Sequence, residues 1–170
     1  MKVSDATEVW YGVVMGHDSP KALRLKAADH PFLRGLDREF LEAISADATD
    51  ETYGTGEVLL REGAVADRFF LVFHGKVAVE VVSPEGVRRT VDTVGPGEVL
   101  GWSWISAPYV WQFDGRALKE TRVVALDATA LRTAMEARPS EGYRLLVRLL
   151  PVVGQRLENT RSQLLDFQGV

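Results

Sequence analysis

The chain has 170 residues, of which 46% are hydrophobic and 26% charged, a composition typical of one soluble globular domain. Its formal net charge of -4 provides no basic field that would favour nucleic acid or an anionic membrane. The absence of cysteine excludes disulfides, thiolate metal sites and a cysteine nucleophile, and no apolar run approaches the roughly 18 residues of a membrane span, so we expect a soluble, cytoplasmic protein.

Residues 1–29 are predicted to form an N-terminal arm that ends in a short helix. Ser19 can cap that helix, and Pro20 suits its first position because proline lacks the N–H that a helix start leaves unpaired. A second helix is predicted over residues 31–46, since the apolar residues there recur at helical spacing on one face. Those residues are Leu33, Leu36, Phe40 and Ile44.

Short β-rich runs separated by glycine follow between Thr49 and Asp127. Strands are predicted over residues 68–73, 76–82, 87–94 and 122–126, and the composition of residues 83–86 indicates a turn. Several short strands with regular turn signals are typical of a small barrel or jelly roll. The region therefore predicts one β domain over residues 30–137, preceded by helix and followed by helix.

The segment 97–117 has the frame of a phosphate-binding cassette. Gly97-Glu98 forms a turn, an apolar pair follows, and Gly101 then opens a short helix, whose free amides suit an anion. Trp102 and Trp111 stand where such a cassette would carry charged side chains. The aromatic residues here indicate either a pocket for a flatter, less anionic ligand or a pocket filled by its own rings.

The last third of the chain is predicted to be helical again, over residues 128–137 and 140–166. Apolar residues in the second helix recur at alternating steps of four and three, which is typical of a coiled-coil seam. That seam consists of Leu146, Leu150, Val153, Leu157, Thr160 and Leu164. Pro151 predicts a kink, or two abutting helices, because it removes a backbone hydrogen bond. We expect residues 138–170 to form a dimerisation helix, since no later segment covers the seam.

This order of elements resembles the cyclic-nucleotide-binding domain of the catabolite activator family over about residues 30–167. The matching residues are His30-Pro31-Phe32-Leu33, Gly35-Leu36, Gly56-Glu57, Glu62-Gly63, Ala66-Asp67, Phe70-Leu71-Val72, Gly75, Gly97-Glu98, Gly101 and Arg116-Ala117-Leu118. The resemblance implies an α+β fold, a β-roll (jelly roll) flanked by an N-terminal helix and a long C-terminal helix. It also implies a dimer paired along that helix.

The resemblance places the cyclic phosphate at the start of the cassette helix. The family's ribose-binding Glu corresponds to Trp102 and its phosphate-binding Arg to Trp111, so we expect binding of cyclic AMP or cyclic GMP to be absent or very weak. Arg116 is either a substitute cation or a strand residue whose guanidinium lies in solvent or in an ion pair. Thr160 matches a threonine that, in the family, can contact the purine. Alternatively, Thr160 is only a polar residue within the helical seam. The candidate ligand residues are Gly101, Trp102, Ser103, Trp111, Arg116 and Thr160.

Two other classes of function compete with a sensor. A metal-dependent enzyme on a similar roll would need clustered His ligands, whereas His17, His30 and His74 are far apart and no serine-hydrolase elbow is present. The acidic pairs at 50–51 and 57/62 are typical of solvated turns. A DNA-binding regulator would need a helix-turn-helix after the long helix, and the chain ends at Val170. We therefore expect a non-enzymatic homodimeric sensor or adaptor without metal, cofactor or nucleic acid, and leave open its small-molecule ligand and its protein partner.

Overall fold

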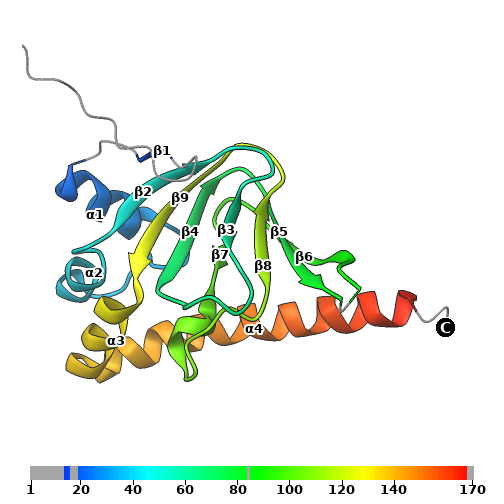
Figure 1. Ribbon diagram of the computed structural model, residues 1–170. Coiled ribbons are helices and arrows are strands. Elements are labelled where there is room, and N and C mark those ends of the chain that lie inside the picture. The colour runs from blue at the N-terminus through cyan, green and yellow to red at the C-terminus, as the bar shows by residue number, and fades with distance from the viewer. Residues whose placement is uncertain (1–13, 16–18, 84, 168–170) are drawn as a thin grey trace, which may run out of the picture.

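The computed structural model describes residues 14–15, 19–83 and 85–167 as an α+β protein (Figure 1). Its helices are α1 (Pro20–Asp29), α2 (Arg38–Ile44), the four-residue 3-10 helix η1 (Trp102–Ile105), α3 (Ala128–Ala137) and α4 (Pro139–Phe167). Its strands are β1 (Val14–Met15), β2 (Thr49–Tyr53), β3 (Val58–Leu60), β4 (Arg68–His74), β5 (Val77–Val82), β6 (Arg88–Val94), β7 (Val99–Leu100), β8 (Asp114–Ala117) and β9 (Thr121–Asp127).

The strands form two antiparallel sheets that build a β-roll. One sheet has the order β1-β2-β9-β4-β7 and the other β3-β8-β5-β6. Four consecutive residues of β4, from Phe69 to Val72, are buried, so both faces of this strand are covered. Figure 1 shows α1, α2 and α3 at one end of the roll and α4 running along it past β6. The predicted β-roll with a helix before it and a long helix after it is confirmed.

The segment between α1 and α2 differs from the prediction. The expected helix over residues 31–46 begins only at Arg38, because Asp37 caps it and accepts a hydrogen bond from the Phe40 N–H at 3.1 Å. The preceding residues form turns instead. The predicted apolar face is nevertheless buried at all four positions, Leu33, Leu36, Phe40 and Ile44. The apolar spacing thus identified core residues correctly and overestimated the length of the helix.

The helix α4 is continuous through Pro151 (Figure 1). The alternative of two abutting helices is therefore wrong. Proline deprives the Val147 carbonyl of its i+4 partner, but Pro151 is exposed and Val147 is half exposed, so water can reach that carbonyl. A proline on the solvent side can thus be accommodated within a helix that packing elsewhere stabilises.

Polar contacts fasten α4 to the turns before α2. The Asp37 N–H donates to Glu141 Oε2 at 2.8 Å, Arg144 donates to the Gly35 carbonyl at 2.9 Å, and Arg148 donates to the Phe32 carbonyl at 2.8 Å. These donors and acceptors lie more than 100 residues apart in sequence. The start of α4 is therefore held against the helical end of the roll.

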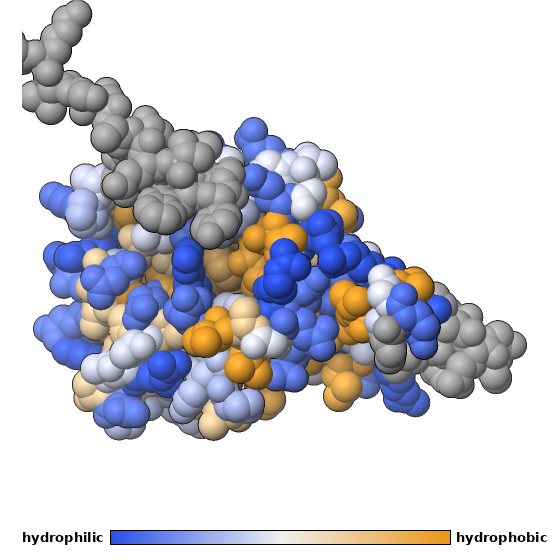
Figure 2. All heavy atoms as spheres, in the orientation of Figure 1, coloured by the Kyte–Doolittle hydropathy of each residue, from blue (hydrophilic) through white to orange (hydrophobic). Residues whose placement is uncertain are grey.

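The outer surface mixes polar with apolar groups (Figure 2). Among the residues that the structure describes, every helix is too short or too polar to cross a membrane. On the face shown in Figure 2, apolar side chains gather in small separate patches among polar ones. A longer row of exposed apolar side chains lies on α4.

Candidate functional site

The cassette lies between β7 and β8, where η1 takes the place of the predicted short helix. Gly101 precedes η1 in the left-handed conformation, with φ 85° and ψ 52°, which favours glycine. No side chain caps the start of η1. A four-residue 3-10 helix presents few aligned amides, so it attracts an anion less than a longer α-helix would.

Trp111, at the position of the phosphate-binding Arg, is a core residue. It is 5% exposed. Its backbone N–H donates to the Ala64 carbonyl at 2.9 Å, and its backbone carbonyl accepts from the Gly63 N–H at 2.9 Å. Its ring lies against Gly101, since a Cβ added there would come within 2.9 Å of Cζ3 and 3.0 Å of Cη2. The indole therefore occupies the space directly beside the cassette turn.

The cavity between the cassette turn and Trp111 is small, with a volume of about 20 Å³. That volume holds roughly one water molecule, whereas sites for small organic ligands typically measure about 300–1,000 Å³. Trp102, half-buried, and Ser103 line this cavity together with Gly101 and Trp111. The structure thus brings together four of the six predicted ligand residues, around a space that their own side chains largely fill.

Arg116 lies on β8 in an ion pair and does not line the cassette cavity. Its Nε donates to Glu80 Oε2 at 3.0 Å and its Nη1 to the Gly56 carbonyl at 3.1 Å. The same network includes Arg88, whose Nη1 lies 2.7 Å from Asp114 Oδ2 and 3.7 Å from Glu80 Oε2. Of the two predicted roles for Arg116, the structure shows the ion pair.

Arg156, which the sequence did not single out as a ligand residue, lines the cassette cavity from α4. It is 6% exposed, its Nε donates to Asp92 Oδ2 at 3.0 Å, and its Nη2 donates to the Val99 carbonyl at 3.4 Å. Asn159 Nδ2 adds a bond of 2.8 Å to Asp92 Oδ1. A sequence signal did exist, because Arg156 falls on the same face of α4 as the buried Leu145 and Leu149.

Thr160 does not line the cassette cavity. Its hydroxyl donates to the Arg156 carbonyl, four residues earlier, at 2.8 Å. Serine and threonine commonly bond back to their own helix in this way. The structure therefore separates Thr160 from the cluster of Gly101, Trp102, Ser103 and Trp111.

The predicted seam on α4 is exposed at its three leucines whose side chains are described. Leu146, Leu150 and Leu157 are 40%, 72% and 67% exposed, whereas Val153 and Thr160 are half-buried. Tyr143 and Val147 extend the same apolar surface at 69% and 50% exposed. The side chain of Leu164 lies outside the described residues. We call this surface, Tyr143, Leu146, Val147, Leu150 and Leu157, the α4 stripe.

The prediction that the acidic pair 50–51 lies in a solvated turn is wrong, because both residues are buried on β2. Glu51 is 1% exposed and accepts hydrogen bonds from Thr49, Tyr53 and Arg68. Burial and the neighbouring Glu51 carboxylate raise the pKa of the Tyr53 hydroxyl well above its ordinary value. The exposed Arg68 thus neutralises the buried Glu51 carboxylate.

The roll, the glycine-opened cassette turn and the long helix α4 define a regulatory domain of the β-roll type. The sequence model of the cyclic nucleotide-binding domain matches residues 50–138. The chain therefore belongs to the cyclic nucleotide-binding domain family.

Two relatives match the chain over a part of their own length. The chain is 26% identical over 134 residues to a CRP-like cAMP-activated global transcriptional regulator of Mycobacterium tuberculosis, covering 79% of this chain and 58% of the relative. It is 30% identical over 140 residues to Glutaminase 1 of Bradyrhizobium diazoefficiens, covering 81% of this chain but 20% of that protein. The matched region is thus only a part of each of these relatives.

One solved structure is matched by this chain over nearly the whole length of that structure. The crystal structure of a putative cyclic nucleotide-binding protein from Geobacter metallireducens superposes with a TM-score of 0.67 and 30% sequence identity. The match covers 82% of this chain and 98% of the other. The fold predicted from the sequence and the family it resembles are both confirmed.

Proposed function

We propose that this chain is a non-enzymatic regulatory module whose cassette pocket is closed by its own side chains. The observation that carries the proposal is the contact of Trp111 with Gly101, which leaves a cavity of about 20 Å³. Of the two interpretations of the aromatic cassette, this small volume favours a filled pocket over an aromatic-lined one. Recognition of cyclic AMP or cyclic GMP is then absent or very weak.

The charges missing from the cassette support the same proposal. Neither Trp102 nor Trp111 can offer ribose a carboxylate or phosphate a guanidinium, and losing a buried charged partner costs about 2–5 kcal/mol of binding. That loss corresponds to roughly 30-fold to several-thousand-fold in affinity for each contact. Arg116 does not compensate, because Glu80 and the Gly56 carbonyl already engage its guanidinium.

The output of the module, in this proposal, passes through α4, which pairs two copies along the α4 stripe. The exposure of Leu146, Leu150 and Leu157 supports such a homodimer. A similar segment is part of a transcriptional regulator in one relative and of a glutaminase in another. We therefore propose a cytoplasmic homodimer that regulates a partner protein, either an enzyme or a transcription factor.

Membership of the cyclic nucleotide-binding domain family favours a second candidate, a true cyclic-nucleotide sensor. In that case Trp111 would have to leave Gly101 when the nucleotide enters. Calorimetry of the purified chain with cyclic AMP and cyclic GMP separates the candidates. If the pocket is filled, no heat of binding is expected up to about 1 mM nucleotide. A dissociation constant above about 1 mM corresponds to a binding free energy weaker than roughly 4 kcal/mol.

A variant pair tests whether the cassette frame is otherwise intact. The double change Trp102→Glu and Trp111→Arg removes both rings and supplies both charges, so it should create measurable nucleotide binding. The control, Trp102→Gln and Trp111→Leu, opens comparable space without charge and should bind at least tenfold more weakly. A micromolar dissociation constant for the unmodified chain would overturn the proposal and establish the nucleotide sensor.

A further inference from the structure

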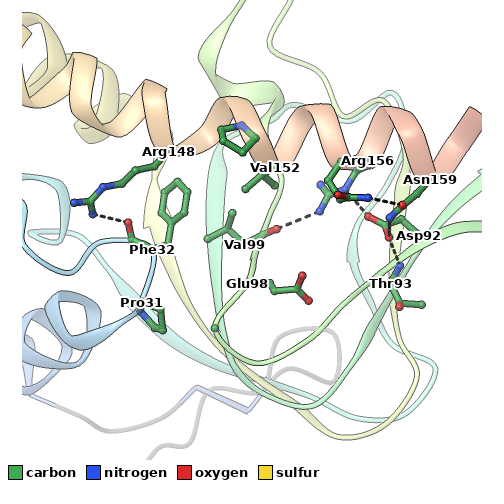
Figure 3. A pocket seen from close by; sticks show the side chains of 13 residues that line it. Pro31, Phe32, Asp92, Thr93, Glu98, Val99, Arg148, Val152, Arg156 and Asn159 are labelled. Atoms are coloured by element: carbon green, nitrogen blue, oxygen red, sulfur yellow. Dashed lines mark hydrogen bonds and ion pairs between the residues drawn. The ribbon is translucent and has the colours of Figure 1, made fainter.

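A groove of about 850 Å³ runs between α4 and the roll. It borders the first cassette residues, Gly97, Glu98 and Val99, but is not lined by Gly101, Trp102, Ser103 or Trp111. Its lining comes from the turn after α1, from β6, from the turn into β7 and from one side of α4. Figure 3 shows Phe32, Val99 and Val152 in the middle of this groove, with Arg148 toward one end and Asp92, Arg156 and Asn159 toward the other. Its volume falls in the range of about 300–1,000 Å³ that small organic ligands occupy.

The two ends of the groove differ in how their charges are balanced. Asp92 accepts bonds from Arg156, Asn159 and the Thr93 N–H, at 3.0, 2.8 and 2.8 Å, so its charge is matched. Arg148 donates to the Phe32 carbonyl and makes no ion pair with any residue that the structure describes. Arg148 therefore presents a half-buried, unneutralised cation with further N–H donors.

The middle of the groove is apolar and includes an aromatic ring. Phe32 packs edge-on against Phe69 in the core, with 5.5 Å between ring centroids, so its position is held. Val152 is half-buried and Val99 buried beside it. A flat apolar body could stack along this wall while an acidic group reaches Arg148.

The exposed carboxylate of Glu98 limits the charge that a ligand can carry. Glu98 also lines the groove, and its Oε2 accepts from the Gly95 N–H at 2.6 Å. A second negative charge on the ligand would be repelled by Glu98 and would find no second unpaired arginine. We propose that this groove binds an aromatic monocarboxylate, with its carboxylate on Arg148 and its ring over Phe32, Val99 and Val152.

This site is distinct from the cluster of Gly101, Trp102, Ser103 and Trp111, although Arg156 lines both cavities, and it is separate from the α4 stripe. At about 100° per residue, Arg148, Gln155 and Asn159 lie on the side of α4 roughly opposite Leu146, Leu150 and Leu157. A ligand in the groove therefore leaves the stripe accessible. It contacts α4 and the roll at once, which gives the module a ligand even when the cassette binds none.

Calorimetry with three matched probes tests the charge requirement. Naphthalene-1-acetate should bind the full chain, whereas the neutral naphthalene-1-acetamide and the dianionic 1-naphthyl phosphate should each bind at least tenfold more weakly. The change Arg148→Met should weaken binding of the acetate roughly 10–100-fold, as expected for loss of a charge-assisted hydrogen bond. The control Arg161→Met, at an exposed arginine of α4 outside the groove, should leave its affinity unchanged.

A second variant keeps the test decisive if Arg148→Met disturbs the turn at Phe32. Gln155 is exposed on the groove wall, so Gln155→Trp fills the groove without altering the core and should abolish binding while the thermal midpoint stays constant. No binding of the acetate at about 1 mM would overturn the proposal. Equal affinity for acid and amide, or unchanged affinity in both Arg148→Met and Gln155→Trp, would overturn it as well. None of these outcomes bears on nucleotide binding at the cassette.

Discussion

His30 is the buried residue whose ionisation most directly affects the fold around the turns before α2. Its side chain is fully buried, and its Nδ1 accepts a hydrogen bond from the Phe32 N–H at 3.3 Å. The proton of the neutral ring must then lie on Nε2, which donates to the Val72 carbonyl at 3.1 Å. Burial lowers the pKa of His30, although the Val72 carbonyl partly opposes this effect.

The lowered pKa predicts a loss of stability in mild acid. Below about pH 6.5 the unfolded chain takes up a proton at His30 that the folded chain resists, so the free energy of unfolding falls as the pH decreases. The contribution of one histidine is at most about 1.4 kcal/mol per pH unit until the folded protein also binds the proton. Urea unfolding at pH 7.5 and 5.5 should show a smaller pH effect in His30→Gln than in the unmodified chain.

The exposed His74 provides the matched control for this experiment. It lies at the end of β4, and His74→Gln should leave the difference in stability between the two pH values unchanged. Equal pH dependence in His30→Gln and the unmodified chain would show that His30 is not what couples folding to pH.

Elements with strong local signals were the ones that the sequence predicted well. α1 begins after its predicted cap, Ser19, and α3 spans Ala128–Ala137, the residues predicted for it. β2, in contrast, reads Thr-Asp-Glu-Thr-Tyr and has no apolar alternation. It is a strand because it pairs with β9 and because Arg68 neutralises the buried Glu51. Such long-range causes lie outside any local window.

The site was predictable to a similar degree. The cassette glycine and the two tryptophans were located from the sequence, because the family frame sets their spacing. The role of Arg156 could not be predicted from the sequence, since arginine on a helix is usually solvated. The partner that permits its burial, Asp92, lies 64 residues away. The packing of Trp111 on Gly101 likewise depends on how the segment between η1 and β8 pairs with Gly63 and Ala64, which no spacing reveals.

At the scale of elements, α4 presents three different faces. Leu145, Leu149 and Arg156 face the core, the groove residues lie to one side, and the α4 stripe faces away from both. The helix can therefore contact the roll, a ligand and a second copy of the chain at the same time.

The α4 stripe predicts a dimer in solution. The double change Leu150→Glu and Leu157→Glu places charges at two of its most exposed positions, where burial in an interface would be strongly opposed. Light scattering should report a dimer for the unmodified chain at tens of micromolar and a monomer for this variant. Ser162→Glu, an exposed position on another side of α4, is the matched control and should remain dimeric. A monomeric unmodified chain at this concentration would refute the pairing.

At the scale of the whole molecule, most arginines on α4 lie close to a carboxylate, so few of them are available to bind a polyanion. Arg144 pairs with Glu141 at 2.9 Å, Arg156 with Asp92 at 3.0 Å, and Arg161 lies 3.9 Å from Glu158. The net charge of the chain is -4. Binding to duplex DNA depends chiefly on neutralising phosphates with lysine and arginine, so even non-specific affinity should be low.

We therefore predict that this chain does not recognise duplex DNA by sequence. Selection from a random duplex library at about 150 mM salt should return no enriched motif, and lowering the salt should at most reveal weak binding without sequence preference. Addition of naphthalene-1-acetate should not change this result, because the proposed groove lies between α4 and the roll and its occupation adds no cation to the surface. Recovery of one reproducible palindromic motif would contradict the prediction. It would mean that a symmetric pair of chains reads DNA through a surface that the charge distribution disfavours.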